Sequence, residues 1–290
     1  MAATIKPQGG KHAISNVMFL FEFSTPLPPH AFAGLLEGTP LHEQLVADLP
    51  RVSKQQQVTM QFPQNLGAEN QFFVNPFAQA FGPPGAIAGI AFDRVKPNGE
   101  PALSVNIQAN MLVILCGEYE RWAGLWAEVK KYLSILTPWL GASKFSALTL
   151  QYTDAFKVSF PRGEAQPLTE LFSSSTRYLP PTFTDVKDAF HSHHGFFTQP
   201  TFGLGGKLLT NVNVNVTETA SIFDVQITTA HKYQLFEMFS PVTDAGSLNP
   251  QMNDVFQYLH DENKVVVGDL LTEQVKEMIS FNAHGAIRPD

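Results

Sequence analysis

Residues Glu118 to Leu140 read EYERWAGLWAEVKKYLSILTPWL, and this segment decides the fold class more than any other. Its apolar side chains recur at spacings of three, four and seven residues, the period of one face of an α-helix. We therefore predict a helix with one continuous apolar stripe. Gly141 is expected to end it, because glycine tolerates a positive φ angle. The stripe consists of Trp122, Leu125, Trp126, Val129, Leu133, Leu136 and Leu140.

Strands are predicted on both sides of this helix. Ile14 to Phe23 is apolar on both faces, which favours a central strand. Asn98-Gly99 lies between two apolar runs, a pattern typical of a β-hairpin. The other expected strands are Gln57–Phe62, Ile87–Val95, Ala102–Ile107, Met111–Cys116 and Ala147–Val158.

The C-terminal half has a second strand and helix pattern. Asn211-Val212-Asn213-Val214-Asn215-Val216 alternates strictly, so the valines are expected on the core face and the asparagines on the other face. That asparagine face could bind a ligand through its amides, but a solvent-facing ladder is favoured. Ile222–Thr229 is the expected hairpin partner. Asn249-Pro250 indicates the start of a helix, and a short helix is expected at Thr272–Ile279.

Together these elements predict an α+β fold, in which antiparallel sheets are covered by a long central helix and C-terminal helices. The order of elements in the first half suggests ferredoxin-like halves. We expect a disordered tail at residues 1–13, a first unit at 14–160, and a second unit at 161–290 packed on the first.

Composition narrows the class of partner. Hydrophobic residues make up 44% of the chain and charged residues 16%, which allows a substantial core. The net charge is −7 and the longest basic run is Lys130-Lys131, so nucleic acid is disfavoured as a partner. The lone Cys116 excludes an intramolecular disulfide and is interpreted as a small buried hydrophobe rather than a nucleophile. No targeting segment and no run of about 18 apolar residues is present, so we expect a cytoplasmic protein without a membrane partner.

An aromatic-rich segment contains Phe72, Phe73, Phe77 and Phe81 among polar residues. Its aromatic rings could pack locally on the core or bind a protein partner. Local packing is favoured for the segment itself. It is nevertheless the best sequence candidate for a partner-binding surface.

A histidine cluster is the candidate metal site. His191, His193 and His194 follow Asp185 and Asp188, and imidazole with carboxylate can bind transition metals. The spacing matches no zinc or iron motif, and His193 and His194 would point to opposite faces of a strand. A solvated loop is therefore favoured over a metal site.

A glycine-rich stretch is the candidate ligand loop. Gly203, Gly205 and Gly206 precede Lys207, and exposed backbone amides beside a lysine can bind phosphate. A phosphate loop places its lysine before Ser or Thr at a helix start, whereas Leu208 begins a predicted strand. A flexible entry into a hairpin is favoured.

Three short segments carry a resemblance to one family: Tyr119-Glu120-Arg121-Trp122, Leu148-Thr149-Leu150-Gln151-Tyr152-Thr153-Asp154 and Leu259-His260-Asp261. The chain from Ile14 to Ile279 is similar to an uncharacterised, sporadically distributed bacterial protein family with a placeholder name. The family carries no activity that could be transferred. Its patchy distribution resembles that of defence-associated genes, which implies an accessory or partner-binding role.

The sequence thus leads to a non-enzymatic protein-interaction or accessory component of a bacterial system, with a protein partner and no cofactor. The alternative is a metal-dependent hydrolase or nuclease that uses the histidine cluster. A third hypothesis is a small-ligand sensor that uses the glycine-rich loop and the asparagine face.

Overall fold

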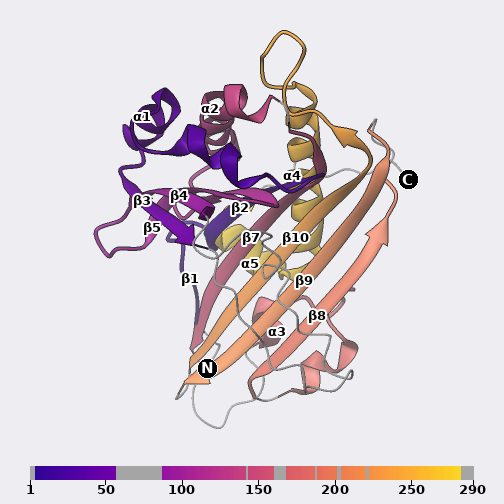
Figure 1. Ribbon diagram of the computed structural model, residues 1–290. Coiled ribbons are helices and arrows are strands. Elements are labelled where there is room, and N and C mark those ends of the chain that lie inside the picture. Colours follow the sequence, from indigo (N-terminus) through magenta and orange to yellow (C-terminus); the bar gives the residue numbers. More distant parts are fainter. Residues whose placement is uncertain are drawn as a thin grey trace, which may run out of the picture.

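The computed structural model describes residues 4–56, 87–141, 143–159, 168–186, 188–200, 204–219 and 222–281. They form a mixed α+β fold with one large antiparallel sheet and several helices (Figure 1). The predicted α+β class is confirmed at this level. The finer parts of that prediction, a long central helix and ferredoxin-like halves, are not confirmed.

The ten strands form one sheet in which β7 occupies a central place. Every paired strand runs antiparallel to its neighbour, and β1 pairs with β7 outside the main order. Both expected units contribute strands, and the division at residue 160 stays a prediction. The main order is β3 (Arg51–Gln56), β4 (Ile87–Val95), β5 (Pro101–Gln108), β6 (Met111–Cys116), β2 (Ile14–Phe23), β7 (Phe145–Ser159), β10 (Ile222–Phe239), β9 (Gly206–Thr219) and β8 (Phe190–Thr198).

Part of the segment 1–13, where a disordered tail was expected, forms a strand. Strand β1 (Thr4–Pro7) and strand β2 lie along the same edge of β7, one after the other: Pro7 pairs with Phe156, and Ile14 pairs with Asp154. Only Ala155 of β7 lies between these two paired positions, so the six residues between Pro7 and Ile14 cannot all pair with β7. They therefore leave the sheet as a short loop at the level of Asp154.

The strands alternate between a buried and an open face, as the valine and asparagine pattern predicted. Val212, Val214 and Val216 of β9 are buried, and Asn215 on the other face is exposed. The hairpin of β4 and β5 is also confirmed, with Gly99 in its turn at a φ of 86°. The strand expected at residues 57–62 lies outside the described residues, and β3 ends at Gln56.

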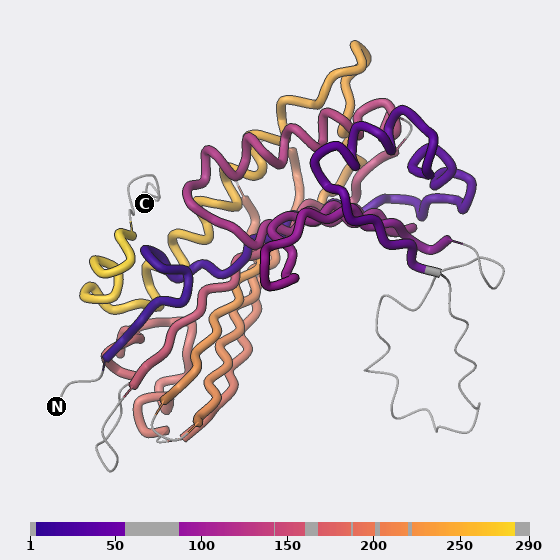
Figure 2. Tube along the Cα trace, turned by 90° about the vertical axis from the view of Figure 1, so that its left-hand side faces the viewer, coloured from indigo at the N-terminus to yellow at the C-terminus, as the bar shows by residue number. Residues whose placement is uncertain are grey.

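The two long helices lie side by side over one face of the sheet (Figure 2). They are α2 (Trp122–Leu140) and α4 (Gln251–Leu270), followed by the short α5 (Glu273–Met278). Helix α4 starts next to the predicted Asn249-Pro250 signal, but Pro250 rather than Asn249 is its N-cap. Asn249, one residue earlier, accepts a hydrogen bond from the backbone N–H of Gln251 at 3.1 Å. The other helical segments are η1 (Pro29–Leu35), α1 (Pro40–Val46), α3 (Leu168–Leu171) and η4 (Pro181–Asp185).

Helix α2 ends at Leu140 with Gly141 as its C-cap, as predicted, but its start and the conformation of Gly141 differ from the prediction. It begins at Trp122, four residues after the predicted start at Glu118. Gly141 has a φ of −56° in the right-handed region, so the expected positive-φ ending is wrong. The later start matters for function, because Tyr119, Glu120 and Arg121 form an extended approach to the helix instead of its first turn.

The core fills the space between the sheet and the helices. Its larger cluster includes Phe19 of β2, Trp126 of α2, Tyr152 of β7 and Phe256 of α4. Cys116 is buried in this cluster, and burial raises the pKa of its thiol to about 12. A thiol that stays protonated is a poor nucleophile, so the sequence interpretation of Cys116 as a core residue fits.

Candidate functional site

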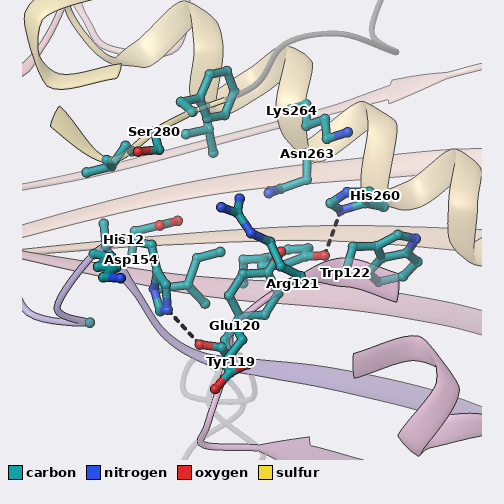
Figure 3. Close-up of a pocket in the computed structure, with 18 residues that line it drawn as sticks. His12, Tyr119, Glu120, Arg121, Trp122, Asp154, His260, Asn263, Lys264 and Ser280 are labelled. Atoms are coloured by element: carbon teal, nitrogen blue, oxygen red, sulfur yellow. Dashed lines mark hydrogen bonds between the residues drawn. The ribbon is translucent and has the colours of Figure 1, made fainter. Parts of the chain in front are cut away.

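A pocket of about 730 Å³ opens where several chain segments meet on the helix side of the sheet (Figure 3). This volume lies within the range typical of small-molecule sites. The lining residues come from the loop between β1 and β2, the approach to α2, strand β7, helix α4, and the end of α5. They include Lys11, His12, Tyr119, Arg121, Trp122, Tyr152, Asp154, His260, Asn263, Lys264, Val267 and Phe281.

The loop between β1 and β2 forms one side of the pocket. Gln8 donates its backbone N–H to the carbonyl oxygen of Ala155 at 2.8 Å, and Ala155 donates to Ala13 at 2.9 Å, so both loop ends are anchored on β7. His12 Nε2 lies 2.6 Å from the carbonyl oxygen of Tyr119. A Cβ at Gly9 would lie 2.6 Å from His12 Nδ1, so only glycine allows this close approach.

The opposite wall is a stack of aromatic rings. The imidazole of His260 is nearly parallel to the indole of Trp122, with ring centroids 4.3 Å apart and an interplanar angle of 7°. Tyr152 Oη lies 2.8 Å from His260 Nδ1. Trp122 also donates its Nε1–H to the side chain of Gln257 at 2.8 Å. These contacts hold three rings from α2, β7 and α4 in one arrangement.

Both polar rings of this wall are neutral at physiological pH. Burial, with a smaller effect of the nearby Lys264, lowers the pKa of His260 to about 3. Burial raises the pKa of Tyr152 well above its usual value. The structure therefore presents a phenol hydroxyl and a neutral imidazole. Within the described residues, His260 Nε2 has no hydrogen-bond partner.

Asp154 is the most unusual group in the pocket. It is only 3% exposed, and burial alone raises the pKa of its carboxyl group to about 7. No hydrogen bond or ion pair involves this carboxyl group in the part of the chain that the structure describes. A carboxyl group deprived of both water and partners carries a free-energy penalty that a bound ligand can relieve.

Three cationic side chains surround the pocket: Lys11, Arg121 and Lys264. Figure 3 shows the Arg121 side chain extending from the start of α2 toward Asn263 of α4. Arg121 makes no ion pair within the described residues, and Lys264 lies 3.6 Å from Asp261. The first turn of α2 also has no side-chain cap, so its backbone N–H groups add positive potential.

The structure does not bring the predicted histidine cluster together. His191, His193 and His194 all lie on the edge strand β8 and are exposed. By strand alternation His191 and His193 share one face, whereas His194 lies on the other face against Tyr178 and Phe196. Asp188 accepts a hydrogen bond from the backbone N–H of Ala189. Among the described residues, no group of three metal-binding side chains occurs.

The glycine-rich stretch is the start of a strand. Gly205 has a φ of 59°, and Gly206 and Lys207 begin β9. A Cβ at Gly206 would overlap the carbonyl oxygen of Gln234 on β10, so this glycine is required for strand pairing. Gly203 lies outside the described residues, as do Phe72, Phe73, Phe77 and Phe81 of the aromatic-rich segment.

Sequence reasoning missed every residue that lines this pocket as a site residue. One signal was available: Asp154 continues the inward positions Leu148, Leu150 and Tyr152 at a spacing of two, so it places a carboxyl group on a core face. His260 likewise follows Leu259 in the apolar pattern of α4. No local sequence pattern indicated that Asp154 and His260 line the same pocket as His12 and Arg121.

Comparison with known proteins does not assign this pocket to a known family. No protein-family model matches the chain, and no curated protein matches it. None of the described helices has both the length and the apolar composition needed to cross a membrane.

Proposed function

We propose that this protein is a non-enzymatic accessory component that binds a small organic anion in the pocket at the start of α2. The observation that carries the proposal is the meeting of Lys11, Arg121 and Lys264, from three separate segments, around one cavity. The chain as a whole has a net charge of −7, whereas the pocket is lined by these three cationic side chains and by two acidic ones, Glu120 and the buried Asp154.

The charges of the pocket favour an anion over a cation at its mouth. Arg121 is exposed and has no ion-pair partner within the described residues, so its guanidinium is available to a ligand. A guanidinium can hold a carboxylate or phosphate through two parallel hydrogen bonds. The uncapped first turn of α2 also favours an anion, because its backbone N–H groups attract negative charge.

The walls favour an organic molecule over a simple inorganic ion. Tyr119, Trp122 and Phe281 contribute rings, and Val267 and Ile279 contribute aliphatic surface. Pockets of this size typically enclose much of a small organic ligand. The neutral Tyr152 and His260 offer hydrogen bonds without adding charge.

This proposal is compatible with the accessory role that the family resemblance implies. It shares ligand binding with the sensor hypothesis, but it places the ligand in the pocket at the start of α2 instead of at the glycine-rich loop and the asparagine face. A protein partner, a bacterial defence system and binding through Phe72 to Phe81 stay predictions. The metal-dependent hydrolase has less support, because the three histidines are divided between two faces of β8.

The test is a thermal-shift screen of the purified full chain against small carboxylates, phosphates and nucleotides, followed by calorimetry of each hit. A ligand at a hundred times its Kd should stabilise the protein by about 2.7 kcal/mol. We expect Arg121→Gln and Lys264→Gln to weaken binding of the hit at least about tenfold.

Lys207→Gln is the matched control, because Lys207 is an exposed lysine of the glycine-rich stretch and does not line the pocket. It should leave the affinity unchanged. Failure of every anion to stabilise the protein would contradict the proposal. Loss of binding in Lys207→Gln alone would instead support the glycine-rich stretch as the ligand site.

A further inference from the structure

We infer that Asp154 receives a cationic amino group, so that the ligand is a zwitterion with an anionic group at one end and an amine at the other. This inference rests on the proposed function for the anionic end. It adds a second, independent subsite at the floor of the same pocket.

The position of Asp154 gives the first argument. It lies on β7 between Tyr152 and Phe156 on the face that the helices cover, and β2 and β10 pair with β7 on either side at this level. Its side chain is therefore held by the middle of a sheet rather than by a loop. The residue is only 3% exposed and still lines the pocket, which places its carboxyl group at the pocket floor.

The lack of an internal partner gives the second argument. No nitrogen of Lys, Arg or His lies within 4.0 Å of this carboxyl group in the described part of the chain. Lys264 is directed to Asp261, and His12 Nε2 to the carbonyl oxygen of Tyr119. A buried carboxyl group is normally paired or hydrogen-bonded, so the missing partner indicates a group supplied from outside the protein.

The surroundings of the carboxyl group select the kind of donor. Ala13, Ile14, Val267 and Ile279 line the same pocket and offer no hydrogen bonds from their side chains. The polar side chains of His12, Asn263 and Ser280 also line it, but within the described residues none of them makes a hydrogen bond to this carboxyl group. An ammonium group on an apolar stem satisfies this environment, because its charge meets the carboxylate and its methylene groups contact the aliphatic side chains. A second anionic group at the floor would instead face the Asp154 carboxylate.

The two ends of the pocket therefore differ in charge and depth. Arg121 is exposed and cationic, whereas Asp154 is buried and acidic. A ligand that joins these two groups is an ω-amino carboxylate or an aminoalkyl phosphate. Such a molecule forms one ion pair at each end, with its apolar middle along the aromatic wall.

The experiment compares matched probes by calorimetry on the full chain: ω-aminohexanoate, hexanoate and hexylamine, followed by shorter and longer homologues of each. We expect one chain length of the ω-amino acid to bind at least about tenfold tighter than the matching carboxylate. Asp154→Asn keeps the shape of the side chain and should abolish this preference while binding of the carboxylate is retained. Arg121→Gln should weaken both acids.

The outcomes separate the two proposals. If the carboxylates bind and depend on Arg121, but no chain length shows an amine preference, the zwitterion inference is wrong and the anion site stands. A preference that survives in Asp154→Asn also overturns the inference. If no probe of either class binds at any length, both proposals fail for this ligand class. Far-ultraviolet circular dichroism checks that each variant is folded.

Discussion

The hydroxyl group of Tyr152 lies 2.8 Å from Nδ1 of His260, and this contact joins the central strand β7 to helix α4 across 108 residues of sequence. Both residues are buried, so neither group can exchange this partner for water. The same pair forms the wall of the pocket. Its integrity is therefore needed for the packing of α4 and for the shape of the site.

Tyr152→Phe should destabilise the protein, because it leaves His260 Nδ1 buried without a partner. The expected loss is about 1–3 kcal/mol in the free energy of unfolding. Urea denaturation followed by circular dichroism measures it. A double-mutant cycle with His260→Leu provides the control: removal of both polar partners should cost less than the sum of the single changes. Additive losses would show that the two side chains do not interact.

Acid should destabilise the protein through His231 and His260. Burial lowers the pKa of His231 to about 4 and is the larger cause that lowers the pKa of His260 to about 3, whereas both start from 6.5 in the unfolded chain. Below pH 6.5 the unfolded chain therefore takes up protons that the folded protein does not, so stability falls as pH falls toward 4.

The change that tests this is His231→Gln, which should reduce the slope of unfolding free energy against pH by up to about 1.4 kcal/mol per pH unit in that window. Asp154 has the opposite effect in the same window, so its carboxyl group partly offsets the two histidines in the wild type. Urea denaturation at several pH values gives the slopes. Equal slopes for variant and wild type would contradict a neutral His231.

Asp154→Asn should stabilise the protein above pH 7. The folded-state pKa of about 7 is higher than the ordinary value of 3.8, so the folded protein keeps a proton that the unfolded chain has lost. Stability therefore decreases as pH rises from 3.8 to 7, and the full penalty remains above pH 7. We expect a gain of roughly 1–4 kcal/mol above pH 7 and little change near pH 4. A variant less stable than wild type at both pH values would show a structural role instead.

Two glycine substitutions should have opposite effects. Gly206→Ala places a Cβ against the carbonyl oxygen of Gln234 and 3.2 Å from the ring of Tyr233, so we expect a loss of about 1–3 kcal/mol. Gly124→Ala on α2 meets nothing within 4 Å and should stabilise the helix by about 0.5–1 kcal/mol. Thermal melts of both variants provide the comparison. A neutral Gly206→Ala would mean that the pairing of β9 and β10 relaxes around the added methyl group.

The fold was predictable from sequence where the spacing of apolar residues or a turn motif indicates the local structure. The valines of β9, the hairpin at Gly99 and the apolar face of α2 were all visible in the sequence. The exact ends were less predictable. Helix α2 begins at Trp122, after three residues that line the pocket. One of them, Tyr119, is contacted through its carbonyl oxygen by His12, 107 residues away in sequence.

The sequence by itself determined the α+β class and most strands and helices, since periodicity and turn residues act over a few positions. Only the tertiary structure decided the site. Strands β1 and β2 share one edge of β7, and this register sends His12 out of the sheet beside Asp154. Helix α4 then brings His260 onto Tyr152 and Trp122. Contacts between residues more than a hundred positions apart depend on strand register and helix packing, and neither leaves a pattern in the local sequence.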